Sequence, residues 1–394
     1  MFYLNIFILL AVLSLLNLQF TDKLFRQLML PLTALILIYI AGFRYETGGD
    51  WDVYTELFRV FPDWEAIRHD FSLLRNKYAE EGFVLLCAII KSLGGTVQEL
   101  FLVVTSVNIL LIASALPKYT KYPVFGLLCY YCILYFNLEM IYIRQATAVA
   151  LCFYALQFIT DRKPVLFILF LVAASFFHRV ALVLLPFWFV LDKKLPVWVY
   201  LTVIGIGAFI MATGVHWIKD IFVHLSSLLG EKYADKAETY TTASLFAVDR
   251  GISLGFVLNL LILAAVMLFK PGIDSRKYGT VHLNMFALSL ALYYYSYELV
   301  EISNRFRLFF LISVIVVLPL LLEALPTFMN RLLGYLLALV YCFNFASAIF
   351  LEKPQAIAYN PYQNYIEFRK NPRPSTGKER LERSHKLFRE SRKK

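Results

Sequence analysis

The sequence predicts an all-α protein that crosses a membrane many times. Of its 394 residues, 60% are hydrophobic and only 17% are charged, and the mean hydropathy is +0.64. These values exclude a soluble domain of this size, because a water-exposed surface needs more polar side chains. Apolar runs recur along the whole chain, so a polytopic integral membrane fold follows.

Twelve apolar runs are predicted to be transmembrane helices, some of them short or broken around an outward-facing cavity. They cover residues 2–20, 27–42, 97–116, 122–138, 141–160, 164–177, 180–191, 196–213, 251–269, 279–297, 306–323 and 331–350. A shorter run at 83–93 fits a partial or interfacial helix. Residues 1–366 then form one membrane domain, with long outer loops at 43–82 and 214–250.

Short basic pairs set the orientation of these helices. The first apolar run has no basic residue before it and no cleavage site after it, so we expect a membrane helix rather than a signal peptide. The positive-inside rule places Met1 outside and the basic pairs in the cytoplasm. The pairs are Lys118/Lys121, Arg162/Lys163, Lys193/Lys194 and Arg276/Lys277.

Residues 164–191 are predicted to form two short helices rather than one long helix. One long helix would put Arg162 and Lys193 on opposite sides, against the charge rule. Two helices of this length span only about 18–21 Å each, less than the roughly 30 Å hydrocarbon core. Their junction at His178 and Arg179 would lie below the outer surface, where charged groups need water. We therefore expect a cavity that opens outward and reaches His178.

The tail, residues 367–394, is predicted to be disordered or at best a frayed basic helix. It holds eleven Lys/Arg and four Glu, a net charge of 11 − 4 = +7. Such a segment can contact anionic lipid, and nucleic acid is not an expected partner. Twelve spans place the tail outside, whereas the charge rule prefers it inside. Either the positive-inside rule does not apply to the tail, which lies far from the last span, or the number of predicted spans is wrong by one near residues 83–93.

Arginines gather at the predicted outer ends of the helices, against the positive-inside bias. Guanidinium groups keep their charge and bind phosphate oxygens in pairs, so several converging arginines suit a diphosphate. The residues are Arg44, Arg144 with its neighbour Gln145, Arg305 and, in reserve, Arg250. For any single arginine the alternative is snorkelling or a salt bridge, for example between Arg144 and Glu139. The segment Tyr359–Tyr365 follows the last span on the same outer side.

Asp50 is a candidate acid–base residue in the first outer loop. It follows the Gly48-Gly49 turn, and it would either cap the next helix or serve in chemistry. Tyr54 lies one turn further on the same face. Asp50 and Asp52 also form a D-x-D pattern, which is weak support for a metal-bound diphosphate.

His178 is the second acid–base candidate, with Arg179 beside it. In this map it lies near mid-membrane, where a buried structural histidine is an equally good interpretation. A histidine near a diphosphate acts as a general base or as a hydrogen-bond donor to phosphate.

The ordered set of segments resembles the EpsG family, polytopic proteins related to the Wzy O-antigen and exopolysaccharide polymerases. The resemblance is carried by Arg44 with Gly49-Asp50 and Tyr54, then "IRQATAVAL", "FHRVALVLLP", "NRFRLFF" and "NPYQNY". These segments run over about residues 1–366 in the same order and with similar spacing. The basic tail lies outside the resemblance.

The resemblance implies a multi-pass enzyme of the bacterial inner membrane, with its active site facing the periplasm. Such polymerases transfer the growing glycan from undecaprenyl diphosphate to the non-reducing end of a lipid-linked repeat unit. The expected partners are the undecaprenyl-diphosphate-linked oligosaccharide, as donor and acceptor, membrane lipid, a chain-length regulator and a flippase.

The chemistry of this reaction assigns roles to the candidate residues. Arg44, Arg144, Arg305 and Arg250 would bind the diphosphate, Asp50 and His178 would be catalytic, and Tyr54, Gln145 and Arg179 would complete the site. Because arginines can replace a metal at a departing diphosphate, neither a metal nor a cofactor is expected.

Other classes of function stay open. A membrane glycosyltransferase with a lipid monophosphate sugar donor keeps an acid in its first outer loop, which Asp50 or Asp52 would supply. A lipid-oligosaccharide flippase should show two related halves, and the sequence has no visible internal repeat. A ligase differs from the polymerase only in its acceptor.

Overall fold

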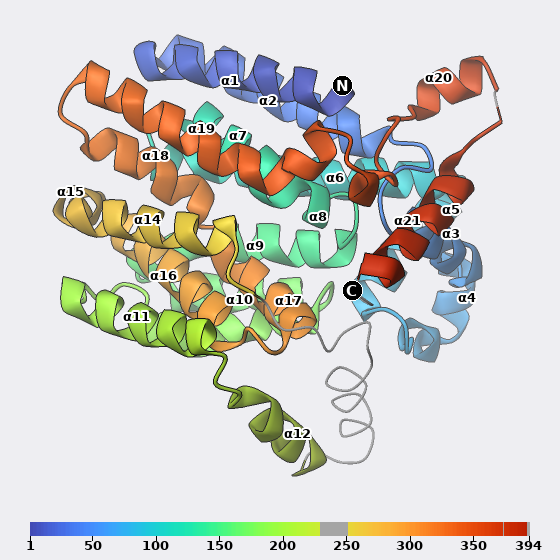
Figure 1. The fold of residues 1–394 in the computed structure, drawn as a ribbon. Helices are drawn as coiled ribbons and strands as arrows, with labels where there is room; N and C mark the ends of the chain where they lie inside the picture. Colours follow the sequence, from blue (N-terminus) through green and yellow to red (C-terminus); the bar gives the residue numbers. More distant parts are fainter. Residues whose placement is uncertain (229–250, 373, 392–394) are drawn as a thin grey trace.

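The computed structural model describes residues 1–228, 251–372 and 374–391 (Figure 1). The regular elements in these ranges are helices, and the extended pairing within them is one isolated bridge between Arg44 and Asn364. The all-α prediction is therefore confirmed for the described part of the chain. Arg250 and most of the predicted outer loop 214–250 lie outside the described residues, so the role expected for Arg250 stays a prediction.

Within these ranges, five helices are long and apolar enough to cross a membrane. They are α1 (Phe2–Gln19), α2 (Lys23–Gly42), α6 (Val97–Tyr119), α9 (Ile143–Thr160) and α19 (Phe328–Phe350). A sixth span is obtained if α17 (Val300–Leu311) and α18 (Val314–Ala324), which are bent by 43°, count as one. The chain has the helices of a membrane protein, but the prediction of twelve spans is not confirmed.

Shorter helices occupy the other predicted spans. The α-helices of 12 to 17 residues reach only about 18–26 Å and the 11-residue 3-10 helix about 22 Å, less than the roughly 30 Å hydrocarbon core. The predicted break in 164–191 is confirmed, because one helix ends at Ser175 and the next begins at Arg179. These elements are α7 (Pro123–Tyr130), the π-helical turn η2 (Tyr131–Tyr135), α8 (Phe136–Leu138), α10 (Pro164–Ser175), the 3-10 helix η3 (Arg179–Phe189), α11 (Val197–Thr213), α14 (Leu254–Leu268), α15 (Lys270–Asp274) and α16 (Gly279–Tyr295).

Short helices fill the predicted outer loops and the tail. The first loop contains α3 (Trp51–Val60), α4 (Trp64–His69), η1 (Phe71–Leu74) and α5 (Glu81–Ser92), and the second begins with α12 (Ile218–Leu228). At the C-terminus follow η4 (Pro354–Ala356), α20 (Tyr365–Lys370) and α21 (Gly377–Ser391). Of the two alternatives for the tail, disorder or a basic helix, residues 377–391 adopt the helix. They form a helix that buries Arg380 and Leu381 against the rest of the protein, and this burial offsets the entropy of ordering.

The centre of the bundle is the segment 123–138, whose side chains are buried almost without exception. A helix that is apolar all round belongs in such a position. In the apolar 18-residue stretch of α9, 78% is buried inside the protein, whereas the corresponding stretches of α1 and α19 are only 28% buried. α1 and α19 therefore present apolar faces outward, as lipid-facing helices do.

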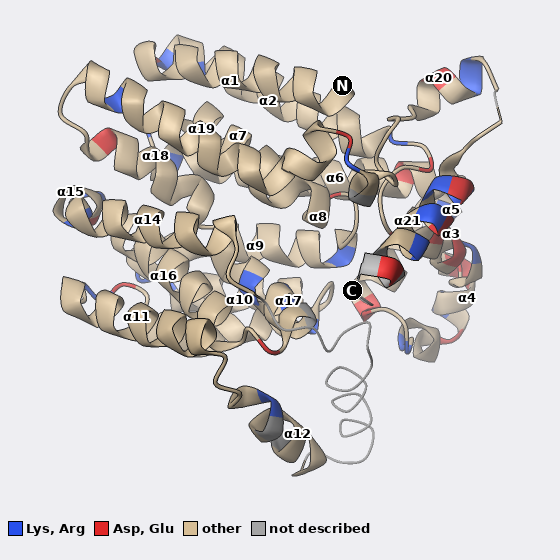
Figure 2. Ribbon diagram, viewed as in Figure 1, with Lys and Arg blue, Asp and Glu red and all other residues tan. Residues whose placement is uncertain are grey.

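Charged residues gather at the two opposite ends of the bundle (Figure 2). The Arg44 end holds the start of α9 together with α3, α5 and α21, and the Lys277 end holds the end of α9. The 18 residues of α9 separate the two ends by about 27 Å. At the Lys277 end, two adjoining pockets are lined by at least one member of each of the four basic pairs. These residues are Lys118, Lys121, Arg162, Lys194, Arg276 and Lys277. The prediction that these pairs share one side is confirmed.

Candidate functional site

Arg44 is held in place by pairing between two segments that lie far apart in the sequence. Directly after α2, Arg44 forms an antiparallel bridge with Asn364. Next to it, the N–H of Tyr45 donates to the oxygen of Gln363 at 2.8 Å. The prediction that the segment Tyr359–Tyr365 lies at the same end as Arg44 is confirmed by these contacts.

The Arg44 side chain is buried, with 1% of its surface exposed. Its Nη1 donates to the backbone oxygen of Glu139, and its guanidinium lies 4.5 Å from the ring centre of Phe101. Nε and Nη2 have no hydrogen-bond partner within the described residues. Burial lowers the pKa of Arg44, because desolvation disfavours the charged form. An anion bound at Nε and Nη2 would relieve this penalty.

The Glu139 side chain does not supply that anion. Its carboxyl group accepts hydrogen bonds from Tyr130 Oη at 2.6 Å and from Asn108 Nδ2 at 3.1 Å. Burial raises its pKa to about 7, against the effect of these bonds and of Arg44. Near neutral pH the group therefore carries only part of a negative charge. The alternative that Glu139 pairs with Arg144 is wrong, because Arg144 has another partner.

Glu80 joins two of the predicted site residues. One carboxylate oxygen pairs with Arg144 Nη1, and the other lies 3.3 Å from Nδ1 of His178. Burial works to raise the pKa of Glu80, but the hydrogen bond from His178 and the charge of Arg144 outweigh it and lower the pKa. Glu80 therefore stays ionised and orients the imidazole, while Nε2 of His178 has no partner among the described residues.

The junction between α10 and η3 brings His178 to the Arg44 end. The N–H of Gly82, in α5, donates to the oxygen of Phe176 at 2.9 Å and so fixes α5 against the junction. The His178 ring stacks on Phe309, with 6.2 Å between ring centres. Arg179 instead points outward, with 74% of its side chain exposed, and pairs with Glu81 at 3.1 Å. Of the two junction residues, only His178 lies beside Glu80 and Arg144. The expected cavity around His178 stays a prediction.

Asp50 precedes α3 but does not cap it, because its side chain accepts no capping hydrogen bond. The turn before it needs glycine at Gly48, which has φ +106° and would place a Cβ 2.7 Å from the oxygen of Met140. Burial raises the pKa of Asp50, and the charge of Asp52 adds to this effect. Arg305 and Arg44 lower it in part, so both cations act on this carboxylate. Asp50 is thus a carboxyl group that leaves α3 uncapped and is acted on by two arginines predicted to bind the diphosphate.

Tyr54 and Gln145 connect the remaining residues. Tyr54 is buried one turn after Asp50, and burial raises its pKa while the nearby charge of Arg144 lowers it. Gln145 Nε2 donates to the backbone oxygen of Arg305 at 2.5 Å. The exposed guanidinium of Arg305 lies 5.6 Å from the ring centre of Tyr142. The structure therefore brings Arg44, Arg144, Arg305, Asp50, Tyr54, Gln145 and His178 to one end of the bundle.

Sequence reasoning missed Glu80, which holds Arg144 and His178 together. The signal was present: Glu80 and Glu81 stand directly before the apolar run 83–93. Two acids at that place indicate the N-terminus of a helix, where negative charge is favourable.

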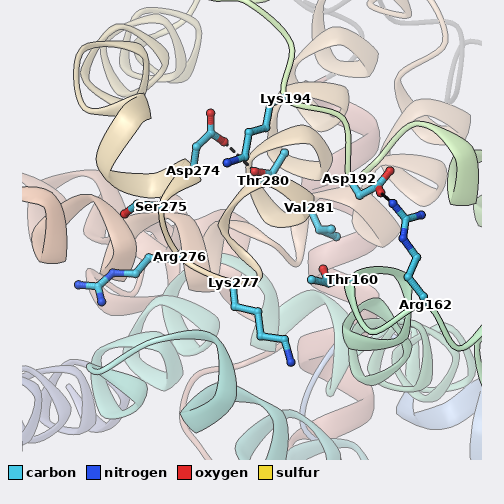
Figure 3. A pocket seen from close by; sticks show the side chains of 10 residues that line it. All are labelled: Thr160, Arg162, Asp192, Lys194, Asp274, Ser275, Arg276, Lys277, Thr280 and Val281. Atoms are coloured by element: carbon cyan, nitrogen blue, oxygen red, sulfur yellow. Dashed lines mark hydrogen bonds and ion pairs between the residues drawn. The ribbon is translucent and has the colours of Figure 1, made fainter.

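The pocket at the Lys277 end is polar but already neutralised (Figure 3). It encloses about 330 Å³ between the ends of α9 and η3 and the start of α16. Arg162 pairs with Asp192 on its wall, and Thr280 donates to Asp274 at 2.8 Å. Because both of its arginines, Arg162 and Arg276, already have carboxylate partners, this pocket is a poorer anion site than the Arg44 end.

Comparison with known proteins gives one family. The model of the EpsG family matches residues 27–364, nearly the whole chain. No curated protein and no solved structure matches the chain. The match includes the described site residues Arg44, Asp50, Arg144, His178 and Arg305 within its range. The chain therefore belongs to the EpsG family, and its fit to polysaccharide polymerase-type membrane proteins follows from that membership.

Proposed function

We propose that this protein is a polysaccharide polymerase of the bacterial inner membrane. It transfers the growing glycan from undecaprenyl diphosphate to the non-reducing end of a second lipid-linked repeat unit, at the periplasmic face. The observation that carries this proposal is the buried guanidinium of Arg44, whose Nε and Nη2 have no partner in the part of the chain that the structure describes. A flippase that delivers the substrate and a chain-length regulator would act together with it.

The bond that breaks joins the anomeric carbon of the donor glycan to a diphosphate oxygen. Its electron pair leaves with undecaprenyl diphosphate, so negative charge grows on that oxygen. Arg44 and Arg305, whose charges both act on Asp50, would stabilise this charge. Arg144, fixed by Glu80, would contact the second phosphate.

The bond that forms joins the acceptor oxygen to the same carbon, and the acceptor hydroxyl loses its proton. His178 is suited to accept that proton, because its Nδ1 lies 3.3 Å from the Glu80 carboxylate and its Nε2 has no hydrogen-bond partner among the described residues. A carboxylate behind an imidazole orients it and stabilises the imidazolium that forms. Asp50 is the second candidate base, since burial raises the pKa of its carboxyl group. Metal independence stays a prediction.

A second candidate function is a glycosyltransferase that uses a lipid monophosphate sugar. The observation that favours it is the Asp50 carboxylate, which does not cap α3. Such enzymes need an acid in the first outer loop. A single phosphate would need fewer arginines than this end supplies. Relative binding of undecaprenyl phosphate and undecaprenyl diphosphate to the purified protein separates the two functions.

The test is complementation of a host that lacks its own polymerase. The wild type and the variants Arg44→Ala, Arg144→Ala, His178→Ala and Arg305→Ala are expressed at matched membrane levels, and the surface glycan is separated on a gel. The proposal expects a ladder from the wild type and single repeat units from the variants. The control Arg276→Ala, from the Lys277 end, should keep the ladder. If the empty host already shows a ladder and lacks one sugar within each unit, the monophosphate transferase is the better account.

A further inference from the structure

The C-terminal helix α21 is fastened to the loop 44–50. Arg380 is buried, and its guanidinium donates to the oxygen of Pro361 at 2.8 Å and to that of Glu46 at 3.0 Å. A longer bond reaches the oxygen of Ala358 at 3.4 Å. One side chain thus joins α21 to both segments that pair at Arg44.

The start of α21 packs against Glu46 with no room for a side chain. A Cβ on Gly377 would lie 2.4 Å from Glu46 Cβ and 2.8 Å from its backbone oxygen. Ser375 Oγ donates to the Glu46 carboxylate. Glu46 itself has φ +44°, a conformation that a non-glycine residue keeps only when its surroundings hold it. The segment around Gly377 supplies those surroundings.

The next turn of α21 carries a side chain whose charge reaches the site. Leu381 is buried beside Arg380, and the charge of His385, one turn further, acts on the Asp50 carboxylate together with Arg305 and Arg44. α21 also lies beyond residues 27–364, the part that matches the family. It is therefore an addition to the matched region that reaches the candidate site.

We propose that α21 is a built part of the site and that Arg380 is a positioning residue. Arg380 holds the loop 44–50 so that Arg44 faces the diphosphate and Asp50 faces the acceptor hydroxyl, an inference that rests on the proposed function. Because the backbone of Glu46 is strained, the loop would relax to another conformation without the hydrogen bonds from Arg380. A displacement of 1 Å at the reacting groups can lower a rate by about 100-fold.

The test uses four variants of the full-length protein. Arg380→Leu removes the hydrogen bonds to loop 44–50 and to the segment 358–361. Gly377→Ala pushes α21 away from Glu46 without changing the charge of the protein. Arg380→Lys keeps the positive charge but loses the planar guanidinium group that donates to several backbone oxygens at once. Lys378→Leu is the matched control, because it removes a cation from the exposed face of the same helix.

The first measurement is amide hydrogen exchange, which does not depend on the function. The N–H groups of Tyr45 and Gly48 donate to the oxygens of Gln363 and Ala358. Their exchange should be faster by about 10-fold in Arg380→Leu and Gly377→Ala, and unchanged in Lys378→Leu. Unchanged exchange in the first two variants would overturn the inference.

The second measurement is kcat for polymerisation at matched membrane levels. A fall of about 10-fold in Arg380→Leu with KM nearly unchanged, and partial recovery in Arg380→Lys, is expected for a positioning residue. Faster exchange with unchanged kcat would overturn the positioning role. If the wild type makes no polymer, the proposed function fails, and binding of undecaprenyl diphosphate to the same variants then decides the role of Arg380.

Discussion

The two ends of the bundle are both rich in cations, but they neutralise them differently. At the Lys277 end, Lys277 pairs with Asp161 at 2.8 Å and Arg276 with Glu323 at 3.0 Å. At the Arg44 end, Arg144 also has a carboxylate partner, but Arg44 is more deeply buried and hydrogen-bonds only a backbone oxygen among the described residues.

Under the proposed function, this difference separates structural cations from a cation that binds a ligand. An ion pair offsets the desolvation of both partners, and the protein needs nothing further. A buried guanidinium with two open nitrogens lowers the stability of the free protein, and a bound anion restores it. The contrast between Arg44 and Arg276 is therefore the clearest place to test the proposed site.

The largest expected effect is that of Arg44→Met. Polymerisation should fall at least about 100-fold, since a preorganised donor to the leaving group is lost. The free energy of unfolding should rise by about 1 kcal/mol, because a poorly compensated buried charge becomes an apolar side chain. Activity and thermal unfolding in detergent measure the two effects.

The matched variant Arg276→Met should behave in the opposite way. It leaves the buried carboxylate of Glu323 without its ion pair, so stability should fall by about 1 kcal/mol while polymerisation persists. If Arg276→Met abolished polymerisation and Arg44→Met did not, the contrast between the two ends would have no functional meaning.

Glu80→Gln should have the next largest effect. The imidazole of His178 loses its orienting carboxylate, so polymerisation should fall by about 30-fold, within the range for acid–base groups. The pKa of Glu80 is lowered in the folded state. Its stabilising contribution is therefore present above the ordinary carboxyl pKa of about 4.3 and is lost as the pH falls further. Thermal unfolding of wild type and variant from pH 7 to pH 3 should converge at the acid end.

Asp50→Asn should lower polymerisation by about 10-fold if Asp50 aligns the acceptor. The pKa of Asp50 is raised in the folded state, so the folded protein binds this proton more readily than the unfolded chain. Wild-type stability should rise as the pH falls from neutral towards the ordinary aspartate value of about 3.9, and the variant should lack this gain. A variant that keeps the full gain would show that the perturbed carboxyl group is another one.

The smallest effect is expected for Arg179→Ala. Its guanidinium is exposed and pairs with Glu81 on the surface, a contact worth at most about 1 kcal/mol. Initial polymerisation rates should stay within about twofold of the wild type. A loss comparable to that of His178→Ala would mean that the junction moves and brings Arg179 into the site.

The sequence allowed the helical class, the break at His178 and the grouping of the arginines to be predicted, because each depends on local composition. It did not allow the number of spans to be predicted, since hydropathy does not show which apolar runs form helices too short to cross. Glu80 was missed because its role depends on the contact between α5 and the α10–η3 junction. The packing of the helical tail could not be predicted because Arg380 and Gly377 both contact Glu46, more than 300 residues earlier.

The most direct test of the central claim is binding of undecaprenyl diphosphate to purified protein. Wild type, Arg44→Gln and Arg276→Gln would be compared in lipid nanodiscs, with undecaprenol as the uncharged reference. The account predicts equal affinity for wild type and Arg276→Gln, and an affinity at least about 10-fold weaker for Arg44→Gln. Equal affinity of all three proteins would contradict the claim that the open guanidinium of Arg44 is the diphosphate site.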